Sequence, residues 1–244
     1  MNMSQFYTED LAYIHDAGFG HVAENASNYL LNVLQQQGIK QGLIVDLGCG
    51  SGIFSQRVYA AGFQVLGIDI SADFIAIACQ RVPQAEFLVE SLFTAEIPPC
   101  IAVTAISECL NYLVDENNTT AERIALFQRI YQALSLGGIL LLDFLEPGQN
   151  LRPDDRSFKQ TEEWAVLVQK EENHQQQQLT RWVTTFRKVG ELYRRDCEVH
   201  HVKLLDGQEI IQELQEIGFQ VQVLEGYDRL KFAIGHIGIF AQKG

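Results

Sequence analysis

The sequence predicts an α/β fold in which helices cover both faces of a mainly parallel sheet. Two observations predict it. Short apolar segments alternate with segments of helical periodicity from residue 20 to residue 145, which is typical of repeated βαβ units. A glycine-rich loop, "GCGSG", follows the first apolar segment, as it does in doubly wound nucleotide-binding sheets.

Residues 20–37 are expected to form the first helix, because apolar side chains recur there at helical spacing and Gly38 follows. Residues 117–135 are also expected to be helical, since Asn and Thr capping candidates precede an apolar face and two glycines follow it. The apolar runs expected to be strands of the sheet are residues 43–47, 64–68, 86–89, 101–106 and 139–144.

The pattern changes after Phe144. Residues 146–163 are rich in Pro, Gly and charge, and predict an irregular connection. Three β-rich segments joined by short polar turns then predict an antiparallel insertion: residues 164–169, 179–189 and 191–205.

In the second of these segments, strand alternation places aromatic residues and arginines on opposite faces. We expect the aromatic face to pack on the core; its other uses would be to roof an acceptor site or to pair with a second subunit. One face carries Trp182, Thr184 and Phe186, and the other carries Arg181, Val183, Thr185 and Arg187.

The chain closes with an α/β pattern. Residues 207–217 predict a helix, and residues 219–226 and 236–243 predict two strands. Because no second helix separates these strands, we expect the last one to be antiparallel. The expected organisation is one domain of residues 1–244: an N-terminal lid and first helix (1–38), a cofactor-binding core (39–146), the β insertion over the acceptor site (150–205), and the closing helix and strands (206–244).

Composition excludes several classes of function. The formal net charge of −13 argues against nucleic acid as a partner, because counterion release needs clustered Lys and Arg. The five cysteines never form a C-x-x-C pair, which fits a cytoplasmic protein and no zinc site. His200 and His201 point to opposite faces of a strand, so no metal is expected. No long apolar segment suggests a membrane, and we expect a monomer or a homodimer.

The glycine loop and a later acid predict a site for an adenosine-containing ligand. Asp69 ends the next strand, where a carboxylate can accept hydrogen bonds from both ribose hydroxyls. The dinucleotide pattern would need glycine where Ile53 stands. Asp46, just before the loop, would repel a pyrophosphate but suit an ammonium and a sulfonium. The residues therefore favour S-adenosylmethionine over NAD.

The segments "VDLGCGSG", "VLGIDIS" and "LSLGGILLLDF" resemble those of class I S-adenosylmethionine-dependent methyltransferases, in register over residues 39–144. The resemblance implies a Rossmann-like seven-stranded sheet whose last strand is antiparallel, an enzyme, and S-adenosylmethionine as cofactor. It also implies that the loop cradles the methionine part and that Asp69 binds the ribose.

One departure concerns the adenine. Many family members carry an Asp just after the third strand, whereas this chain has Glu90 and Ser91, so we expect Ser91 and Leu92 to contact the adenine. The residues expected to bind the cofactor are Asp46, Gly48, Cys49, Gly50, Gly52, Asp69, Ile70, Ser91, Leu92 and Glu108.

Polar residues at the exits of the fourth and fifth strands are expected to face the ligand, because ligands bind at the carboxyl ends of strands in open α/β sheets. Glu108 directly follows an apolar strand, so it is either a general base or an acid that hydrogen-bonds a neighbouring loop. The segment "LNYL" resembles bacterial methyltransferases that act on small molecules, including sugar N-methyltransferases. The residues expected to bind the acceptor are Asn111, Tyr112, Asp143 and Trp164.

The N-terminal segment "YIHDAGFG" carries Tyr13 and His15 as further catalytic candidates. It is either a lid over the cofactor or an ordinary N-terminal cap packed on the sheet.

The expected function is transfer of a methyl group from S-adenosylmethionine to an N or O nucleophile of a small molecule, by in-line displacement. A catalytically inactive cofactor-binding module and a nicotinamide oxidoreductase are the alternatives.

Overall fold

The computed structural model describes residues 6–149 and 155–244, and its centre is a seven-stranded sheet in the order β10-β13-β5-β4-β1-β2-β3. Strands β1 to β5 are parallel, whereas β13 runs antiparallel to both β5 and β10. The predicted fold, including the antiparallel last strand, is confirmed. The strands are β1 (Leu43–Leu47), β2 (Gln64–Asp69), β3 (Glu86–Val89), β4 (Cys100–Ala105), β5 (Leu134–Leu145), β10 (Phe219–Leu224) and β13 (His236–Lys243).

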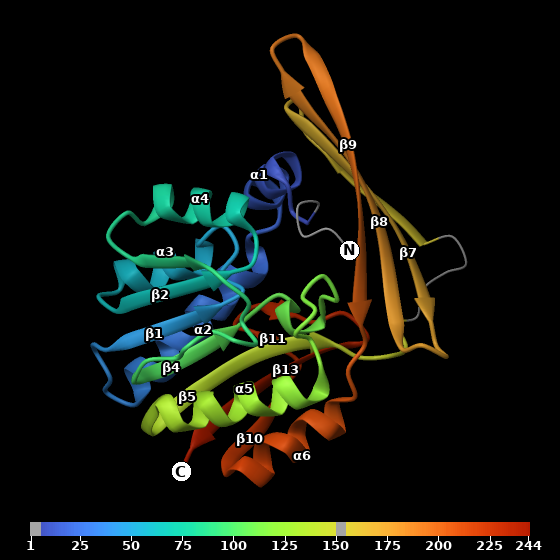
Figure 1. Ribbon diagram of the computed structural model, residues 1–244. Helices are drawn as coiled ribbons and strands as arrows, with labels where there is room; N and C mark the ends of the chain where they lie inside the picture. Colours follow the sequence, from blue (N-terminus) through green and yellow to red (C-terminus); the bar gives the residue numbers. More distant parts are fainter. Residues whose placement is uncertain (1–5, 150–154) are drawn as a thin grey trace.

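Helices cover both faces of this sheet (Figure 1). On one face, α2 and α3 pack side chains such as Leu30 and Phe54 against the strands. On the other face, α5 and α6 contribute Phe127 and Leu214 to a second apolar cluster. The helices are α1 (Glu9–Gly18), α2 (His21–Gln36), α3 (Ile53–Ala60), α4 (Ala72–Arg81), α5 (Thr120–Ala133) and α6 (Gly207–Ile217). No helix in the described part of the chain is long and apolar enough to span a membrane.

The expected helix at 117–135 is shorter in the structure. It begins after Thr119, whose side chain accepts a hydrogen bond from the Glu122 amide. It ends before Leu134, which already pairs with Cys100 of β4. The pairing of β5 with β4 therefore begins before the two glycines that were expected to end the helix.

The insertion after β5 is a four-stranded antiparallel sheet that extends beside the main sheet (Figure 1). It consists of β6 (Asp155–Gln160), β7 (Trp164–Asn173), β8 (Gln178–Val189) and β9 (Leu192–Lys203), paired in sequence order. Strand β6 was not expected, because its charged and polar sequence lacks the apolar pattern that would indicate pairing with β7. Its side chains are mostly exposed, which explains the missing apolar pattern.

Helix α1 was not expected either, and it joins the insertion to the core. Its apolar side chains Leu11 and Ile14 pack on Trp164, Val166 and Val183 of the insertion. The two acids in its first turn bind arginines of β8 and β9, and the buried carboxylate of Asp10 accepts hydrogen bonds from both guanidinium groups.

The expected orientation of β8 was wrong. Trp182 is 39% exposed, whereas Val183 and Thr185 are buried, and Val183 packs in one cluster with Leu11 and Ile14 of α1. The face that carries the arginines is the covered one, because the acids of α1 neutralise Arg187 and because Glu108 neutralises Arg181. The aromatic face points away from the core.

Candidate active site

The glycine loop after β1 adopts a backbone that favours glycine. Gly48, Gly50 and Gly52 have φ values of 67°, 52° and 78°. A Cβ atom at Gly48 would lie 2.5 Å from the Cβ of Cys109, whereas a Cβ at Gly50 would meet no atom within 4 Å. The loop therefore passes close to the segment after β4 at its first glycine.

Asp69, at the end of β2, is fixed against this loop. Its Oδ2 accepts a hydrogen bond from the Gly50 amide and its Oδ1 accepts one from the Ser71 amide, both at 2.8 Å. Burial raises the pKa of Asp69 to about 6, and the amide donors oppose that rise. The Ile70 amide also stabilises the charged form, and because a carboxylate has roughly four lone-pair sites, acceptor capacity remains for a ligand's hydroxyl.

Asp46 turns away from the loop surface. Its carboxylate accepts hydrogen bonds from the Ser55 hydroxyl at 2.7 Å and the Thr104 hydroxyl at 2.8 Å. Burial raises the pKa of Asp46 to about 6. This side chain ties β1 to β4 and α3, so its contribution to a ligand site is to hold the loop in place.

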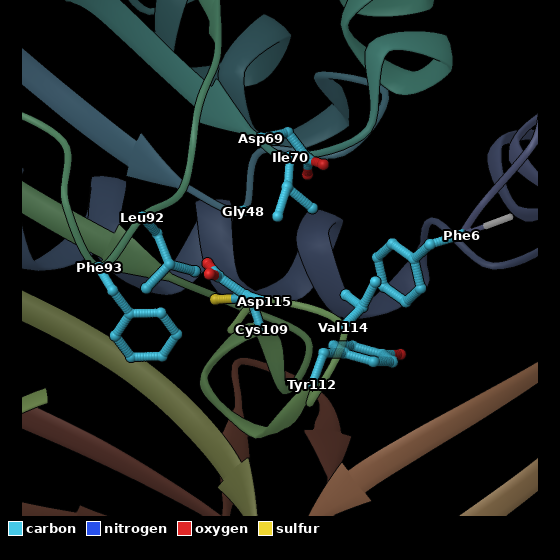
Figure 2. A pocket seen from close by; sticks show the side chains of 10 residues that line it. All are labelled: Phe6, Gly48, Asp69, Ile70, Leu92, Phe93, Cys109, Tyr112, Val114 and Asp115. Atoms are coloured by element: carbon cyan, nitrogen blue, oxygen red, sulfur yellow. The ribbon is translucent and has the colours of Figure 1, made fainter. Parts of the chain in front are cut away.

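A narrow cavity of about 50 Å³ lies beside the loop, and we call it the donor cavity. Asp69 and Ile70 border it at the end of β2, Tyr112 and Val114 border it from the segment after β4, and Phe6 lies at one side (Figure 2). The hydroxyl of Ser91 donates to Asp115, which also borders the cavity. The full lining is Phe6, Gly48, Asp69, Ile70, Leu92, Phe93, Cys109, Tyr112, Val114 and Asp115.

The turn after β4 has a strained backbone. Ser107 and Glu108 both have left-handed φ values, 66° and 63°, which are uncommon for residues with side chains. The buried Asp143 of β5 holds this turn by accepting hydrogen bonds from both amides, at 3.0 and 2.9 Å. The same carboxylate accepts from Tyr227 and pairs with His236. Asp143 therefore positions the turn that carries Glu108.

Glu108 forms an ion pair with Arg181 of the insertion at 2.6 Å. Burial alone would raise the pKa of Glu108, but the guanidinium outweighs burial and the net shift is downward. Arg181 also donates to the Tyr112 hydroxyl, which lies 3.2 Å from the Tyr7 hydroxyl. The four side chains link the turn after β4, the insertion and the N-terminal segment.

Residues 6–8 form a strap over the site. The amides of Tyr7 and Thr8 donate to the Glu198 carboxylate on β9, at 2.8 and 2.9 Å. The Tyr7 carbonyl accepts from Ser71, which follows Asp69. The aromatic ring of Tyr7 lies against Phe74 with ring centroids 4.8 Å apart. The strap thus bridges the end of β2 and the insertion.

A second cavity, of about 460 Å³, lies between the core and the insertion, and we call it the acceptor cavity. It adjoins the donor cavity at Tyr112, which lines both. His15 of α1 also lines it, with its ring among those of Tyr7, Phe19 and Phe74. Burial lowers the pKa of His15 to about 4, so the imidazole is neutral at physiological pH.

Comparison with known proteins identifies the domain. Residues 44–138 match the family model for a methyltransferase domain. The sequence is 29% identical over 189 residues to YqeM of Bacillus subtilis (strain 168), which is named provisionally as a methyltransferase; the match covers 75% of each chain. Residues 44–138 thus form a methyltransferase domain, and the comparisons support an S-adenosylmethionine-dependent enzyme. The cofactor predicted from the glycine loop and Asp69 is confirmed at the level of the family.

Solved methyltransferase structures share this fold over nearly the whole chain. An S-adenosylmethionine-dependent methyltransferase from Clostridium acetobutylicum has a TM-score of 0.79 at 16% identity, over 96% of this chain and 97% of that one. The sugar N-methyltransferase KedS8 of a Streptoalloteichus species has a TM-score of 0.73 at 16% identity, over 95% and 92%. A shorter sequence match joins this chain to the 18S rRNA (guanine-N(7))-methyltransferase RID2 of Arabidopsis thaliana, at 26% identity over 44% of this chain and 39% of RID2.

Some residues expected at the methyltransferase site lie elsewhere. Tyr13 lies outside both cavities, with the Arg187 guanidinium 4.0 Å from its ring centroid. Trp164 is buried among α1 side chains and contacts Gly18. The side-chain amide of Asn111 donates to the carbonyls of Leu145 and Lys203 and its oxygen accepts from the Leu145 amide, so it fastens backbone segments together. We therefore do not propose these three as ligand contacts.

Sequence reasoning missed Tyr7, Arg181 and Lys170 as site residues. Arg181 was assigned to a face that should point away from the core, and Tyr7 precedes the segment that was interpreted as a lid. Only the long-range pairing of β8 with its neighbours and the ion pair to Glu108 bring Arg181 into the site. Within residues 6–149 and 155–244, no cluster of three or more ligating side chains could hold a metal ion.

Proposed function

We propose that this methyltransferase transfers a methyl group to an N or O nucleophile of a small molecule held in the acceptor cavity. The observation that carries the proposal is that this cavity is lined by α1, the insertion and residues 230–236, and shares the lining residue Tyr112 with the donor cavity. Its volume, about 460 Å³, lies within the range of roughly 300–1,000 Å³ of small-molecule sites.

The donor cavity fits the adenosyl part of the cofactor by the chemistry of its lining. Asp69 has unused acceptor capacity for ribose hydroxyls, and Ile70, Leu92 and Phe93 supply apolar contact for a flat ring. The cavity of about 50 Å³ is small for such a ligand, and Phe6 of the strap borders it. We propose that the strap moves when the donor binds.

The bound cofactor supplies a methyl group made electrophilic by a sulfonium. The acceptor would supply the N or O lone pair that bonds to the methyl carbon, and the electron pair of the broken C–S bond would stay on sulfur. His15 is proposed to take the proton that the acceptor loses, because its imidazole is neutral and lines the cavity. We propose Glu108 as a positioning residue, since its carboxylate is bound to Arg181.

The experiment that tests this proposal is incubation of the full chain with methyl-labelled S-adenosylmethionine and, in separate arms, a small-metabolite extract and total RNA. The proposal expects labelled product in the metabolite arm only. The RNA arm matters because RID2, a relative over part of the chain, is named as an rRNA methyltransferase. Label in RNA alone would contradict the proposal. Binding of S-adenosylhomocysteine without label in either arm would favour an inactive binding module.

A further inference from the structure

The acceptor cavity has an excess of positive charge in a chain whose formal net charge is −13. Lys170, Arg181 and Lys231 are among the described residues that line it, and Glu108 is the one carboxylate among them. The Glu108 carboxylate already forms an ion pair with Arg181, at 2.6 Å. The charge on Lys170 and Lys231 is therefore unmatched within the lining.

Lys170 is the more enclosed of the two lysines. It sits on β7 opposite Arg181 of β8 and Asp155 of β6. Burial and the Arg181 charge lower the pKa of Lys170, while Glu108 and Asp155 oppose that shift. Across the described residues, no acid lies within 4.0 Å of its ammonium group. A half-buried ammonium with no carboxylate partner among residues 6–149 and 155–244 is unfavourable, and a bound anion would relieve that cost.

The other charged groups facing Lys170 do not supply that anion. Glu108 lies against Arg181, and Asp155 is a cross-strand neighbour beyond ion-pair distance. The His236 imidazole pairs with the Asp143 carboxylate at 2.8 Å, behind the turn. The remaining wall is apolar and would hold a hydrocarbon or ring portion of a ligand; its members include Leu11, Phe19, Val22, Val166, Val168 and Phe232.

From this charge pattern we infer that the methyl acceptor is a small molecule with an anionic group, a carboxylate or a phosphate, anchored by Lys170 beside Arg181. Its apolar portion lies on the valines of β7, and its nucleophilic atom faces Tyr112, where the two cavities adjoin. This inference rests on the proposed function, since it names the acceptor's class.

The test measures anion binding to the full chain saturated with S-adenosylhomocysteine. Benzoate, phenyl phosphate and the neutral benzamide are titrated into wild type, Lys170→Gln and Lys40→Gln. Lys40 is a matched control, because it is exposed and precedes β1, at the end of that strand opposite to the glycine loop. We expect at least one anion to bind wild type and the control at least tenfold more tightly than benzamide, with that preference lost in Lys170→Gln. The anion that binds more tightly distinguishes carboxylate from phosphate.

The binding measurements would overturn the inference if benzamide bound as tightly as the anions, if the anion preference survived in Lys170→Gln, or if no anion bound at all. Retained S-adenosylhomocysteine affinity shows that a variant is folded with its donor site intact. Methyl transfer to a neutral or cationic acceptor would likewise overturn the inference while leaving the proposed function standing. A protein that binds no S-adenosylhomocysteine would instead contradict the proposed function.

Discussion

Asp69 is the side chain on which donor affinity depends most directly. Replacement by Ala removes the acceptor of the proposed ribose hydroxyls and frees the Gly50 amide. We expect Asp69→Ala to weaken binding of S-adenosylhomocysteine by about 1.5–3 kcal/mol, the scale of hydrogen bonds to charged groups. Calorimetry measures the binding affinity for S-adenosylhomocysteine. Asp73→Ala is the control, since Asp73 is an exposed acid on α4. Unchanged affinity in Asp69→Ala would place the ribose elsewhere.

The affinity of the donor site should also depend on pH. Burial raises the pKa of Asp69 to about 6, so the free protein takes up a proton there as pH falls through 6. The ribose hydroxyls donate to the carboxylate form, so affinity is full above pH 7 and lost below pH 6. We expect S-adenosylhomocysteine binding to weaken about tenfold between pH 7.5 and pH 5. The same titration in Asp69→Ala should be much shallower, because only Asp46, whose pKa burial also raises to about 6, still titrates beside the loop; a slope equal to that of wild type would assign the effect to Asp46 or another group.

His15 is the residue on which proton removal from the acceptor is proposed to depend. We expect His15→Ala to lower kcat about 100-fold, with S-adenosylhomocysteine affinity unchanged, because general-base catalysis contributes about that much. Added imidazole should restore part of the rate. His174→Ala, in an exposed turn of the insertion, is the control. Equal losses of kcat and of donor affinity, without rescue by imidazole, would mean that His15 is structural.

At the scale of elements, the strap of residues 6–8 is expected to control exchange of the donor. Glu198 accepts hydrogen bonds from the Tyr7 amide, the Thr8 amide and the Thr8 hydroxyl. Glu198→Ala removes these three hydrogen bonds and loosens the strap. S-adenosylhomocysteine should then dissociate at least about tenfold faster, as expected when hydrogen bonds to a charged group worth ~1.5–3 kcal/mol are lost. Stopped-flow measurements test this against Glu191→Ala, at the exposed β8–β9 turn. Dissociation at the wild-type rate would argue against a moving strap.

The sequence predicts the elements of the sheet well and the elements around it less well. Residues 43–47 match β1 in both bounds, because a buried strand leaves an apolar run in the sequence. Residues 86–89 match β3 in both bounds through the apolar run of residues 87–89, although that strand is largely exposed. Strand β6 has no such run, since most of its side chains are exposed and only its pairing with β7 makes it a strand. Helix α1 is short, and its apolar face is defined by contact with the insertion.

Some residues of the candidate site could likewise be predicted from the sequence, and others could not. Asp69, Ile70 and Leu92 could be placed from local motifs, because the loop after β1 and the ends of the next strands come together in every sheet of this topology. Arg181 and Tyr7 could not be placed. Their positions depend on how the insertion and the N-terminal segment fold back on the core. The ion pair of Arg181 and the hydrogen bonds of Tyr7 join residues far apart in the sequence.

At the scale of the whole molecule, the account requires two adjoining cavities with separate roles. The donor cavity lies at the carboxyl ends of β1 and β2, and the acceptor cavity lies under the insertion. A change that fills only the second should abolish transfer while leaving donor binding intact. Val168 of β7 lines the acceptor cavity, and its neighbour Leu167 is 45% exposed and on the opposite face of the strand.

The most direct test is therefore to compare Val168→Trp with Leu167→Trp, using wild-type activity on the acceptor found in the metabolite extract as reference. We expect Val168→Trp to bind S-adenosylhomocysteine within about twofold of wild type and to lose at least 99% of methyl transfer, since one misplaced group at a reacting centre costs about 100-fold. Leu167→Trp should retain both properties. Methyl transfer at the wild-type rate by Val168→Trp would contradict the assignment of the acceptor to this cavity.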